Sequence, residues 1–308
     1  MDVKLTFLLF VTLYSVSNAV LAPTIQLIDG NNIPILALGT YGSDKDKSRM
    51  RQTVNWAVEA GYRHIDTAAL YNNEREIGEG LQDVINRGLV RREDMFITTK
   101  LWDNNHEREK VVPALQESLN RLGLEYVDLF LIHRPSSEDE NGKPLNIDIV
   151  ETWQGMIEAK RLGLARSIGV SNFDAKQIDR LIASTQVIPA VNEIEIHLSK
   201  GQADLVNYCQ ARGIAVMAYS PFGFLVSRDI PNPPPPKIDD PVLVNIARKY
   251  GKTVGQVVLR YLIDRYLIPI PKSTNKARLE ENINVFDFRL TEEDCAALSQ
   301  FDSNTGIF

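Results

Sequence analysis

The chain has 308 residues, of which 44% are hydrophobic and 24% charged, so it can bury a sizeable core and is neither disordered nor fibrous. Its 34 Lys and Arg against 40 Asp and Glu give a net charge of -6, which excludes the basic surface that nucleic acids and anionic membranes attract. Small-molecule chemistry is the function class that remains.

The first segment resembles a secretory signal peptide. Lys4 precedes an apolar run at 5–16, and small residues follow at Ser17 and Ala19, the positions that signal peptidase reads. The run is shorter than the ~20 residues that a membrane span needs. We therefore expect 1–19 to be removed, 20–308 to form the mature chain, and the protein to be secreted into the extracellular space. A retained apolar tail is the alternative.

The next segments predict a hairpin and then an alternation of strands and helices. Two short strands at 25–28 and 33–36 flank Asp29-Gly30-Asn31-Asn32, which is typical of a turn. Eight strand candidates follow, at 36–39, 63–66, 95–99, 127–132, 167–170, 190–194, 215–218 and 267–270. Between them lie segments of helical period, such as Met50 to Val58 and Val111 to Leu122.

Eight strand–helix units joined by right-handed crossovers predict an α/β fold, a (β/α)8 TIM-type barrel whose N-terminal end the hairpin plugs. We expect 20–308 to form this single barrel domain. A doubly wound sheet is the alternative, but no Gly-x-Gly-x-x-Gly follows the first strand, and Gly78-Glu79-Gly80 lies inside a helical pattern.

Two features outside the strand pattern need an interpretation. The segment Pro231 to Pro236, after the seventh strand, is expected to be a stiff polyproline loop over the barrel mouth, with a proline-rich ligand motif as the alternative. Cys209 and Cys295 are far apart and lack Cys-x-x-Cys spacing, which argues against a disulfide scaffold and a structural zinc site. We expect two separate buried thiols; the sequence also allows one bridge.

Polar side chains follow the predicted strands at the end where barrels of this class carry their active sites. They are Asp66 with Tyr71, Lys100, His133, Ser171 with Asn172, the segment Glu193 to His197, Tyr219 with Ser220, and Lys272 with Ser273. Each alone has an ordinary structural explanation, such as a helix cap or a solvated surface. Their coincidence on one rim indicates a site.

Four of these residues form a proton-donating group for a carbonyl oxygen. Tyrosine is a weak acid with a pKa of ~10, but the Lys100 ammonium favours the phenolate of Tyr71 and eases proton donation. Asp66 would keep Lys100 charged, and His133 would orient the substrate oxygen by a hydrogen bond. The group cannot supply a hydride, so a nicotinamide cofactor must.

The sequence resembles the aldo-keto reductase family over essentially the whole mature chain. Three ordered motifs carry the resemblance: Gly61 to Ala68 with Tyr71 to Glu74, Ile168 to Phe173, and Ile270 to Thr274. It implies a (β/α)8 barrel and an oxidoreductase that reduces a carbonyl with NADPH. The implied catalytic tetrad is Asp66, Tyr71, Lys100 and His133, with Tyr71 as the general acid.

The same resemblance implies where NADPH binds. The implied contacts are Ser171, Asn172, Glu193, Tyr219, Ser220, Lys272, Ser273, Thr274, Arg278 and Asn282. Tyr219 is the platform under the nicotinamide, and Ser171 and Asn172 hold its carboxamide. Lys272 and Arg278 beside hydroxyls suit a ribose 2'-phosphate, which NADH lacks. An ordinary helix surface with both cations in water is the alternative.

Three positions depart from the family pattern. Arg134 and Tyr41 stand where pocket tryptophans are common, whereas Trp102 matches; we expect these three residues to line the substrate pocket. Glu193 replaces a carboxamide-binding Gln. An ionised Glu accepts but does not donate a hydrogen bond, so it would favour the oxidised cofactor unless burial keeps it protonated.

A secretory signal is unusual in this family, and the combination resembles the insect 3-dehydroecdysone 3β-reductases. We expect a monomer that reduces a ketosteroid such as 3-dehydroecdysone and binds neither nucleic acid nor membrane. Few residues follow the helical stretch Thr291 to Phe301, which predicts little tail over the barrel mouth and an open pocket for a polyhydroxylated substrate.

Three alternative functions are weighed against this one. The first is a general reductase of aldehydes or xenobiotic carbonyls. The second is a non-catalytic NADPH-binding barrel, which the intact tetrad argues against. The third is a metal hydrolase barrel; its candidate ligands are His64, Asp66, Lys100, His133 and His197. No His-x-His and no aspartate at the end of the eighth strand support it.

Overall fold

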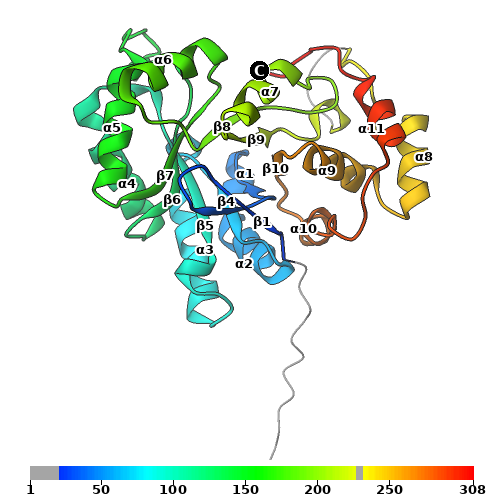
Figure 1. The fold of residues 1–308 in the computed structure, drawn as a ribbon. Helices are drawn as coiled ribbons and strands as arrows, with labels where there is room; N and C mark the ends of the chain where they lie inside the picture. Colours follow the sequence, from blue (N-terminus) through cyan, green and yellow to red (C-terminus); the bar gives the residue numbers. More distant parts are fainter. Residues whose placement is uncertain (1–20, 227–231) are drawn as a thin grey trace, which may run out of the picture.

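A computed structural model describes residues 21–226 and 232–308 of the chain. The expected signal peptide, 1–19, lies outside the described residues. Figure 1 shows helices arranged around a central parallel sheet whose eight strands follow one another in chain order, from β3 to β10. The strands are β3 (Leu38–Gly39), β4 (His64–Asp66), β5 (Phe96–Leu101), β6 (Val127–Ile132), β7 (Ala165–Ser171), β8 (Val191–Glu195), β9 (Ala215–Tyr219) and β10 (Ile268–Ile270).

The sheet closes into a barrel where its first strand meets its last. The backbone N–H of Ala37 donates to the carbonyl of Pro269 at 3.1 Å, and that of Gly39 donates to Pro271 at 3.0 Å. The predicted (β/α)8 barrel is therefore confirmed, and no strand end differs from its predicted position by more than two residues.

The predicted hairpin is also present, with strands one or two residues away from their predicted positions. It pairs β1 (Thr24–Gln26) antiparallel with β2 (Asn32–Pro34). Leu27 and Ile33 are buried in the same apolar cluster as the barrel-interior side chains. Asn31 Nδ2 donates to Ser167 Oγ at 3.0 Å, near the beginning of β7. The hairpin therefore covers the N-terminal end of the barrel.

The described helices pack outside the sheet or flank its ends. They are α1 (Asp44–Lys47), α2 (Met50–Ala60), α3 (Glu74–Asn86), α4 (Arg108–Leu122), α5 (Ile149–Arg161), α6 (Ala175–Thr185), α7 (Ala203–Ala211), α8 (Pro241–Tyr250), α9 (Val254–Asp264), α10 (Lys276–Ile283) and α11 (Glu292–Ser299). Several begin at capping boxes, for example Thr253 with Gln256 at α9, and such caps stabilise a helix by about 1 kcal/mol. None of these helices is long and apolar enough to cross a membrane.

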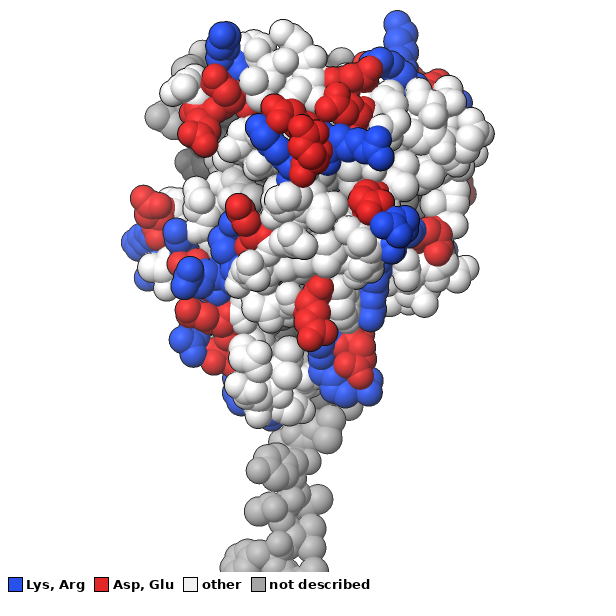
Figure 2. Space-filling model, turned by 90° about the vertical axis from the view of Figure 1, so that its left-hand side faces the viewer, with Lys and Arg blue, Asp and Glu red and all other residues white. Residues whose placement is uncertain are grey.

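Gly78 shows how closely the helices pack. A Cβ atom at this position in α3 would lie 2.3 Å from the carbonyl oxygen of Leu122, at the end of α4. The helical pattern around Gly78-Glu79-Gly80 thus reflects close packing between two helices and no phosphate loop. Figure 2 shows positive and negative side chains interspersed on one side of the molecule.

The barrel interior divides into an apolar and a polar end. Phe96, Leu129, Met217 and Ile268 fill it toward the hairpin, where strands begin. The opposite end, where strands finish, is lined by charged and hydroxyl groups. The fold therefore places the polar group at the C-terminal rim. Both cysteines lie elsewhere and are free thiols; Cys209 is buried and Cys295 half-buried.

Candidate active site

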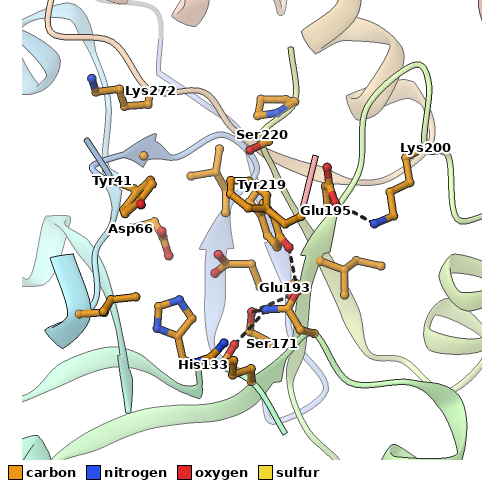
Figure 3. Close-up of a pocket in the computed structure, with 18 of the residues that line it drawn as sticks. Tyr41, Asp66, His133, Ser171, Glu193, Glu195, Lys200, Tyr219, Ser220 and Lys272 are labelled. Carbon is orange, nitrogen blue, oxygen red and sulfur yellow. Dashed lines mark hydrogen bonds and ion pairs between the residues drawn. The ribbon is translucent and has the colours of Figure 1, made fainter. Parts of the chain in front are cut away.

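A cavity of about 800 Å³ opens at the C-terminal end of the barrel. Figure 3 shows its wall, with Tyr41 and Lys272 on one side and Glu195 with Lys200 on the other. Its lining includes Asp66, Tyr71, His133, Ser171, Asn172, Glu193, Tyr219, Ser220 and Lys272 from the predicted site, and also Tyr41, Trp102 and Arg134.

Asp66 and Lys100 form a buried ion pair at the base of this site. Asp66 ends β4 and Lys100 lies on the neighbouring β5, so parallel pairing brings both to the same rim. Lys100 Nζ lies 2.7 Å and 2.8 Å from the two carboxylate oxygens of Asp66, and it also donates to the Thr67 carbonyl at 3.1 Å. Burial alone would lower the pKa of Lys100, but the negative charge around it, above all Asp66, raises the pKa above its usual value.

Tyr71 is presented to the ammonium by a short 3-10 helix, Ala69–Tyr71, that follows β4. Lys100 Nζ lies 3.3 Å from the Tyr71 hydroxyl oxygen. The ring of Tyr41 lies against that of Tyr71, with centroids 5.1 Å apart. Burial raises the pKa of Tyr71 well above 10, and the opposing effect of Lys100 is smaller. Lys100 therefore acts in the expected direction and lowers the pKa that burial alone would give Tyr71.

His133 directly follows β6 and faces the same cavity. Its ring lies edge-on to Tyr71 and to Trp102, with centroids 5.6 Å and 5.2 Å apart. Burial, reinforced by Lys100 and Arg134, lowers the pKa of His133 to about 2, so the imidazole is neutral. Its Nδ1 atom is buried without a hydrogen-bond partner among the described residues. A neutral imidazole with an unused hydrogen-bonding nitrogen can bind a substrate oxygen.

Glu193 on β8 completes the charged cluster. Its Oε1 atom lies 3.3 Å from Lys100 Nζ, and its side chain is 2% exposed. Burial raises the pKa of Glu193 well above its usual value, and the neighbouring Asp66 raises it further. Of the two possibilities that the sequence leaves open, the structure favours the protonated carboxyl.

Three residues expected to hold the nicotinamide form a connected group beside Glu193. Tyr219 donates from its hydroxyl to Asn172 Oδ1 at 2.9 Å, and Asn172 Nδ2 donates to the carbonyl of His133 at 3.0 Å. Ser171 Oγ donates to the backbone carbonyl of Glu193 at 2.8 Å. Asn172 has a φ of 62°, and Ser220, after Tyr219, has a φ of 50°. Such left-handed conformations are costly for non-glycine residues and concentrate at functional sites.

The residues expected at the adenosine end lie around the end of β10 and on α10. Lys272 is at the cavity edge, whereas the cavity lining does not include Ser273, Thr274, Arg278 or Asn282. Arg278 is exposed on the first turn of α10, and Asn282, one turn later, is 5% exposed. Lys272 and Thr274 both contact Asp46 on α1, Lys272 at 2.8 Å and Thr274 at 3.2 Å.

The three expected pocket residues all line the cavity. Tyr41 is 59% exposed, and Trp102 lies beneath Arg134, whose guanidinium carbon is 4.7 Å from the indole centroid. Arg134 Nε donates to the buried carboxyl of Asp103, and its Nη2 lies 3.5 Å from Glu138. Arg134 is therefore held in place as part of the pocket wall.

The expectation that little tail covers the barrel mouth is wrong. The segment after α11 returns to the rim, where the N–H of Thr305 donates to Ser199 at 2.9 Å and that of Ile307 donates to Glu195 Oε1 at 2.6 Å. Phe308 lines the cavity, and its ring centroid lies 6.1 Å from that of Tyr219. The tail is short, but Glu195 directs it across the opening.

The expected proline-rich wall is only partly described. Residues 227–231, which include Pro231, lie outside the described residues. None of residues 232–236 lines the cavity. Pro235 instead accepts a hydrogen bond from Ser199 Oγ at 3.0 Å. This part of the loop therefore contacts the same segment that the tail contacts.

Three residues that matter here were not assigned a role from the sequence: Asp46, Asp103 and Glu195. Glu195 ends β8 and Asp103 lies two residues after β5, so a survey of strand ends finds both, whereas Asp46 lies on α1, seven residues after β3. Conversely, the histidines of the metal alternative are separated. His64 Nε2 lies 2.9 Å from Thr98 Oγ1 at the apolar end, and His197 pairs with Glu195. Within 21–226 and 232–308, no three His, Cys, Asp or Glu residues are grouped as metal ligands.

Comparison with known proteins gives a consistent picture. The Aldo/keto reductase family model matches residues 35–303. A Bombyx mori protein named Aldo-keto reductase AKR2E4 is 58% identical over 290 residues, which are 93% of this chain and 94% of that one. Mus musculus Estradiol 17 beta-dehydrogenase 5 is 38% identical over 296 residues, 91% of this chain and 92% of the relative. The crystal structure of Bombyx mori AKR2E4 in complex with NADP covers 94% of this chain and 96% of its own, with a TM-score of 0.93 and 57% identity.

Proposed function

The chain belongs to the aldo/keto reductase family, and we propose that its polar C-terminal rim is the active site of an NADPH-dependent reductase acting on a polyhydroxylated ketosteroid. As a family member, it is an NADP-dependent oxidoreductase that reduces carbonyl compounds to alcohols. The observation that carries the site assignment is the Tyr71 hydroxyl 3.3 Å from the Lys100 ammonium, on the wall of the cavity.

The rim has the groups that this cofactor needs. Tyr219 would carry the nicotinamide on its ring, and Asn172 with Ser171 would hold the carboxamide. At the other end, Lys272 lies at the cavity edge, and Arg278 lies on the first turn of α10 with no acidic partner among the described residues. Two cations and the hydroxyls of Ser273 and Thr274 suit a phosphate. The bound dinucleotide would supply the hydride.

The chain's own residues then manage the proton and the carbonyl. His133 donates a hydrogen bond to the substrate oxygen and orients the carbonyl for attack. Tyr71 gives its hydroxyl proton to that oxygen as the carbonyl carbon is reduced, so one O–H bond breaks and another forms. Lys100 stabilises the resulting phenolate, and Asp66 holds Lys100 charged and in position. The high pKa of Tyr71 keeps the acid protonated throughout the neutral range.

The part of the cavity beyond the nicotinamide supports a hydroxylated substrate. The volume of about 800 Å³ is shared between the cofactor end at Tyr219 and Asn172 and the substrate wall at Tyr41, Trp102 and Arg134. The substrate wall carries polar groups at Arg134 and at the Tyr41 hydroxyl, which suit a hydroxylated compound better than a purely apolar one. The name of the mouse relative is that of a steroid dehydrogenase, which supports a steroid as the substrate class.

A general reductase of aldehydes is the second candidate, because Tyr71 and His133 would recognise the carbonyl alone. The test is kcat/KM with NADPH for 3-dehydroecdysone and for a short-chain aldehyde. A steroid substrate should show the lower KM, because it contacts more of the wall. A clear advantage for the aldehyde would favour the second candidate. NADPH binding without turnover of any carbonyl would favour a non-catalytic barrel.

We further propose that the protein is a secreted monomer. Support for secretion comes from the sequence alone: an apolar run at 5–16 and small residues at Ser17 and Ala19. N-terminal sequencing of protein from the medium of secreting eukaryotic cells should find a start near Val20. Cytosolic protein that still begins at Met1 would refute secretion, and sedimentation analysis tests the monomer.

A further inference from the structure

Glu193 is an acid at the centre of the proposed catalytic group that the mechanism above leaves without a role. Its Oε1 atom is 3.3 Å from Lys100 Nζ, and its Oε2 atom is buried with no hydrogen-bond partner in the described part of the chain. Figure 3 shows its carboxyl group among the residues that line the cavity. A side chain in this position acts on both the ammonium and whatever binds above it.

The neighbours of Glu193 make a second negative charge unfavourable. The titratable groups that face it are Asp66 from β4, Tyr71 from the 3-10 helix, Lys100 from β5 and Tyr219 from β9, with Glu195 further along its own strand. Asp66 already binds the only ammonium among these groups through both oxygens. An ionised Glu193 would leave an excess negative charge in a buried cluster, which is unfavourable.

The position of Oε2 agrees with a neutral acid. A buried carboxylate oxygen normally has a donor facing it, whereas the protonated oxygen of a carboxylic acid needs an acceptor. Asp66 and Glu193 each place a carboxyl oxygen on the same Lys100 Nζ, at 2.7 Å and 3.3 Å, so the two carboxyl groups are neighbours. One proton shared between two adjacent carboxyl groups satisfies both.

We propose that Glu193 is a positioning residue that holds a proton in the working enzyme and, by losing it, shifts the site from carbonyl reduction toward binding of the oxidised cofactor. This inference rests on the proposed function. As a neutral acid, Glu193 does not compete with Asp66 and Tyr71 for Lys100. The ammonium can then stabilise the phenolate that forms when Tyr71 releases its proton. As a carboxylate, it competes for Lys100 and opposes that phenolate.

The same ionisation discriminates between the two cofactor forms. The oxidised nicotinamide ring carries a positive charge and the reduced ring carries none. A carboxylate at the cavity wall therefore attracts NADP+ and does little for NADPH. By linkage, the pKa of Glu193 is lower in the NADP+ complex than in the protein without cofactor. NADP+ binding therefore strengthens relative to NADPH binding as the pH rises from the pKa of the complex to that of the protein without cofactor.

The first experiment measures the dissociation constants of NADP+ and NADPH by protein fluorescence from about pH 6 to about pH 10, the range into which burial moves a carboxyl pKa. In the wild type, the dissociation constant of NADP+ should fall relative to that of NADPH by about tenfold or more across this pH range. Glu193→Gln keeps the shape of the side chain but cannot ionise, so the ratio of its two dissociation constants should stay constant. Glu158→Gln removes an exposed acid on the outside of α5, away from the cavity, and should follow the wild type. A constant ratio in the wild type overturns the proposal whether or not the variant folds.

The second experiment needs no cofactor. Infrared difference spectra of wild type minus Glu193→Gln at neutral pH should contain the carbonyl stretch of a protonated carboxylic acid. Absence of this band, with carbonyl reduction intact, overturns the inference alone. Absence of carbonyl reduction in the wild type overturns the proposed function and with it the role of Glu193, while the band itself remains.

The third readout is the pH profile of reduction. The wild-type rate should fall on the alkaline side as Glu193 ionises, and the profile of Glu193→Gln should remain flat to a higher pH. A merely structural role would lower the rate of the variant equally at every pH. Parallel profiles would therefore contradict the proposal.

Discussion

Asp46 forms an ion pair with Lys272, with 2.8 Å between Oδ2 and Nζ, at the place where the proposed 2'-phosphate site begins. Asp46 also accepts a hydrogen bond from Thr274, so one carboxylate occupies two of the residues assigned to the phosphate. Its pKa is lowered to about 2 by Lys272 and Ser43, against the opposing effect of burial. Asp46 therefore stays ionised at neutral pH, and a phosphate must compete with it for Lys272.

Asp46→Asn should therefore strengthen NADPH binding. A partly exposed ion pair contributes about 0.2 to 1 kcal/mol, so the dissociation constant should fall by about 1.4- to fivefold. NADH lacks the phosphate, and its affinity should not change. Fluorescence titration of both cofactors tests this. Weaker NADPH binding would show instead that Asp46 supports Lys272 in the bound state.

Preference for NADPH over NADH should depend on Lys272 and Arg278. Each charge-assisted contact with a phosphate contributes ~1.5 to 3 kcal/mol. Replacing both residues with methionine should bring the two cofactors to nearly equal affinity, mainly by weakening NADPH binding. If the double variant discriminates as the wild type does, the phosphate binds elsewhere.

Tyr71→Phe should lose nearly all carbonyl reduction and retain NADPH binding. Only the hydroxyl is deleted, and it is the proposed proton donor. Lys100→Met should be similarly damaging, because Asp66 then remains as a buried charge without its partner. Steady-state rates and cofactor titrations provide the measurements. Turnover above about a tenth of wild type in Tyr71→Phe would refute the assignment of the general acid.

The barrel and its rim were predictable from the sequence because both depend on local patterns. Short apolar strands alternate with helical periods, and a polar residue at the end of each parallel strand must reach the same rim. The ion pair between Asp46 and Lys272 was not predictable, since it joins α1 to the end of β10, two polar segments distant in sequence. The direction of the pKa shift of Tyr71 was not predictable either, because burial outweighs the Lys100 charge. The extent of burial depends on how the folded chain encloses the side chain.

The tail contact at Glu195 should make stability depend on pH. Lys200, His197 and the N–H of Ile307 together lower the pKa of Glu195 to about 2, although burial opposes them. A lowered pKa means that the stabilisation is present above the unfolded-state pKa of ~4.3 and is lost as the pH falls toward 2. Glu195→Gln should thus lower the free energy of unfolding by about 2 to 3 kcal/mol at neutral pH.

Urea unfolding at neutral and acidic pH tests this prediction. The difference between wild type and Glu195→Gln should shrink as the pH falls below ~4.3. Glu158→Gln is the control, because Glu158 lies on the outside of α5 and, in the described part of the chain, pairs with the exposed Arg161 alone. It should leave the stability unchanged. An equal difference at both pH values would mean that Glu195 stabilises the tail by packing and not by its charge.

Arg134 should determine which large substrates the cavity accepts. Asp103 and Glu138 already balance the charge of its guanidinium, and Trp102 supports its face. Its Nη1 atom has no partner among the described residues, so it can donate to a substrate oxygen. Because the charge is balanced, a neutral hydroxyl or carbonyl suits this donor better than a carboxylate.

Arg134→Gln should consequently raise KM for a polyhydroxylated ketosteroid by about 10- to 100-fold, the value of one charged hydrogen bond. The rate with a short-chain aldehyde should change little, because such a substrate does not reach the guanidinium. Arg166→Gln, at the beginning of β7 on the opposite end of the barrel, is the matched control and should leave both substrates unaffected. Equal losses with steroid and aldehyde would assign Arg134 a different role, that of holding the neighbouring His133 in place.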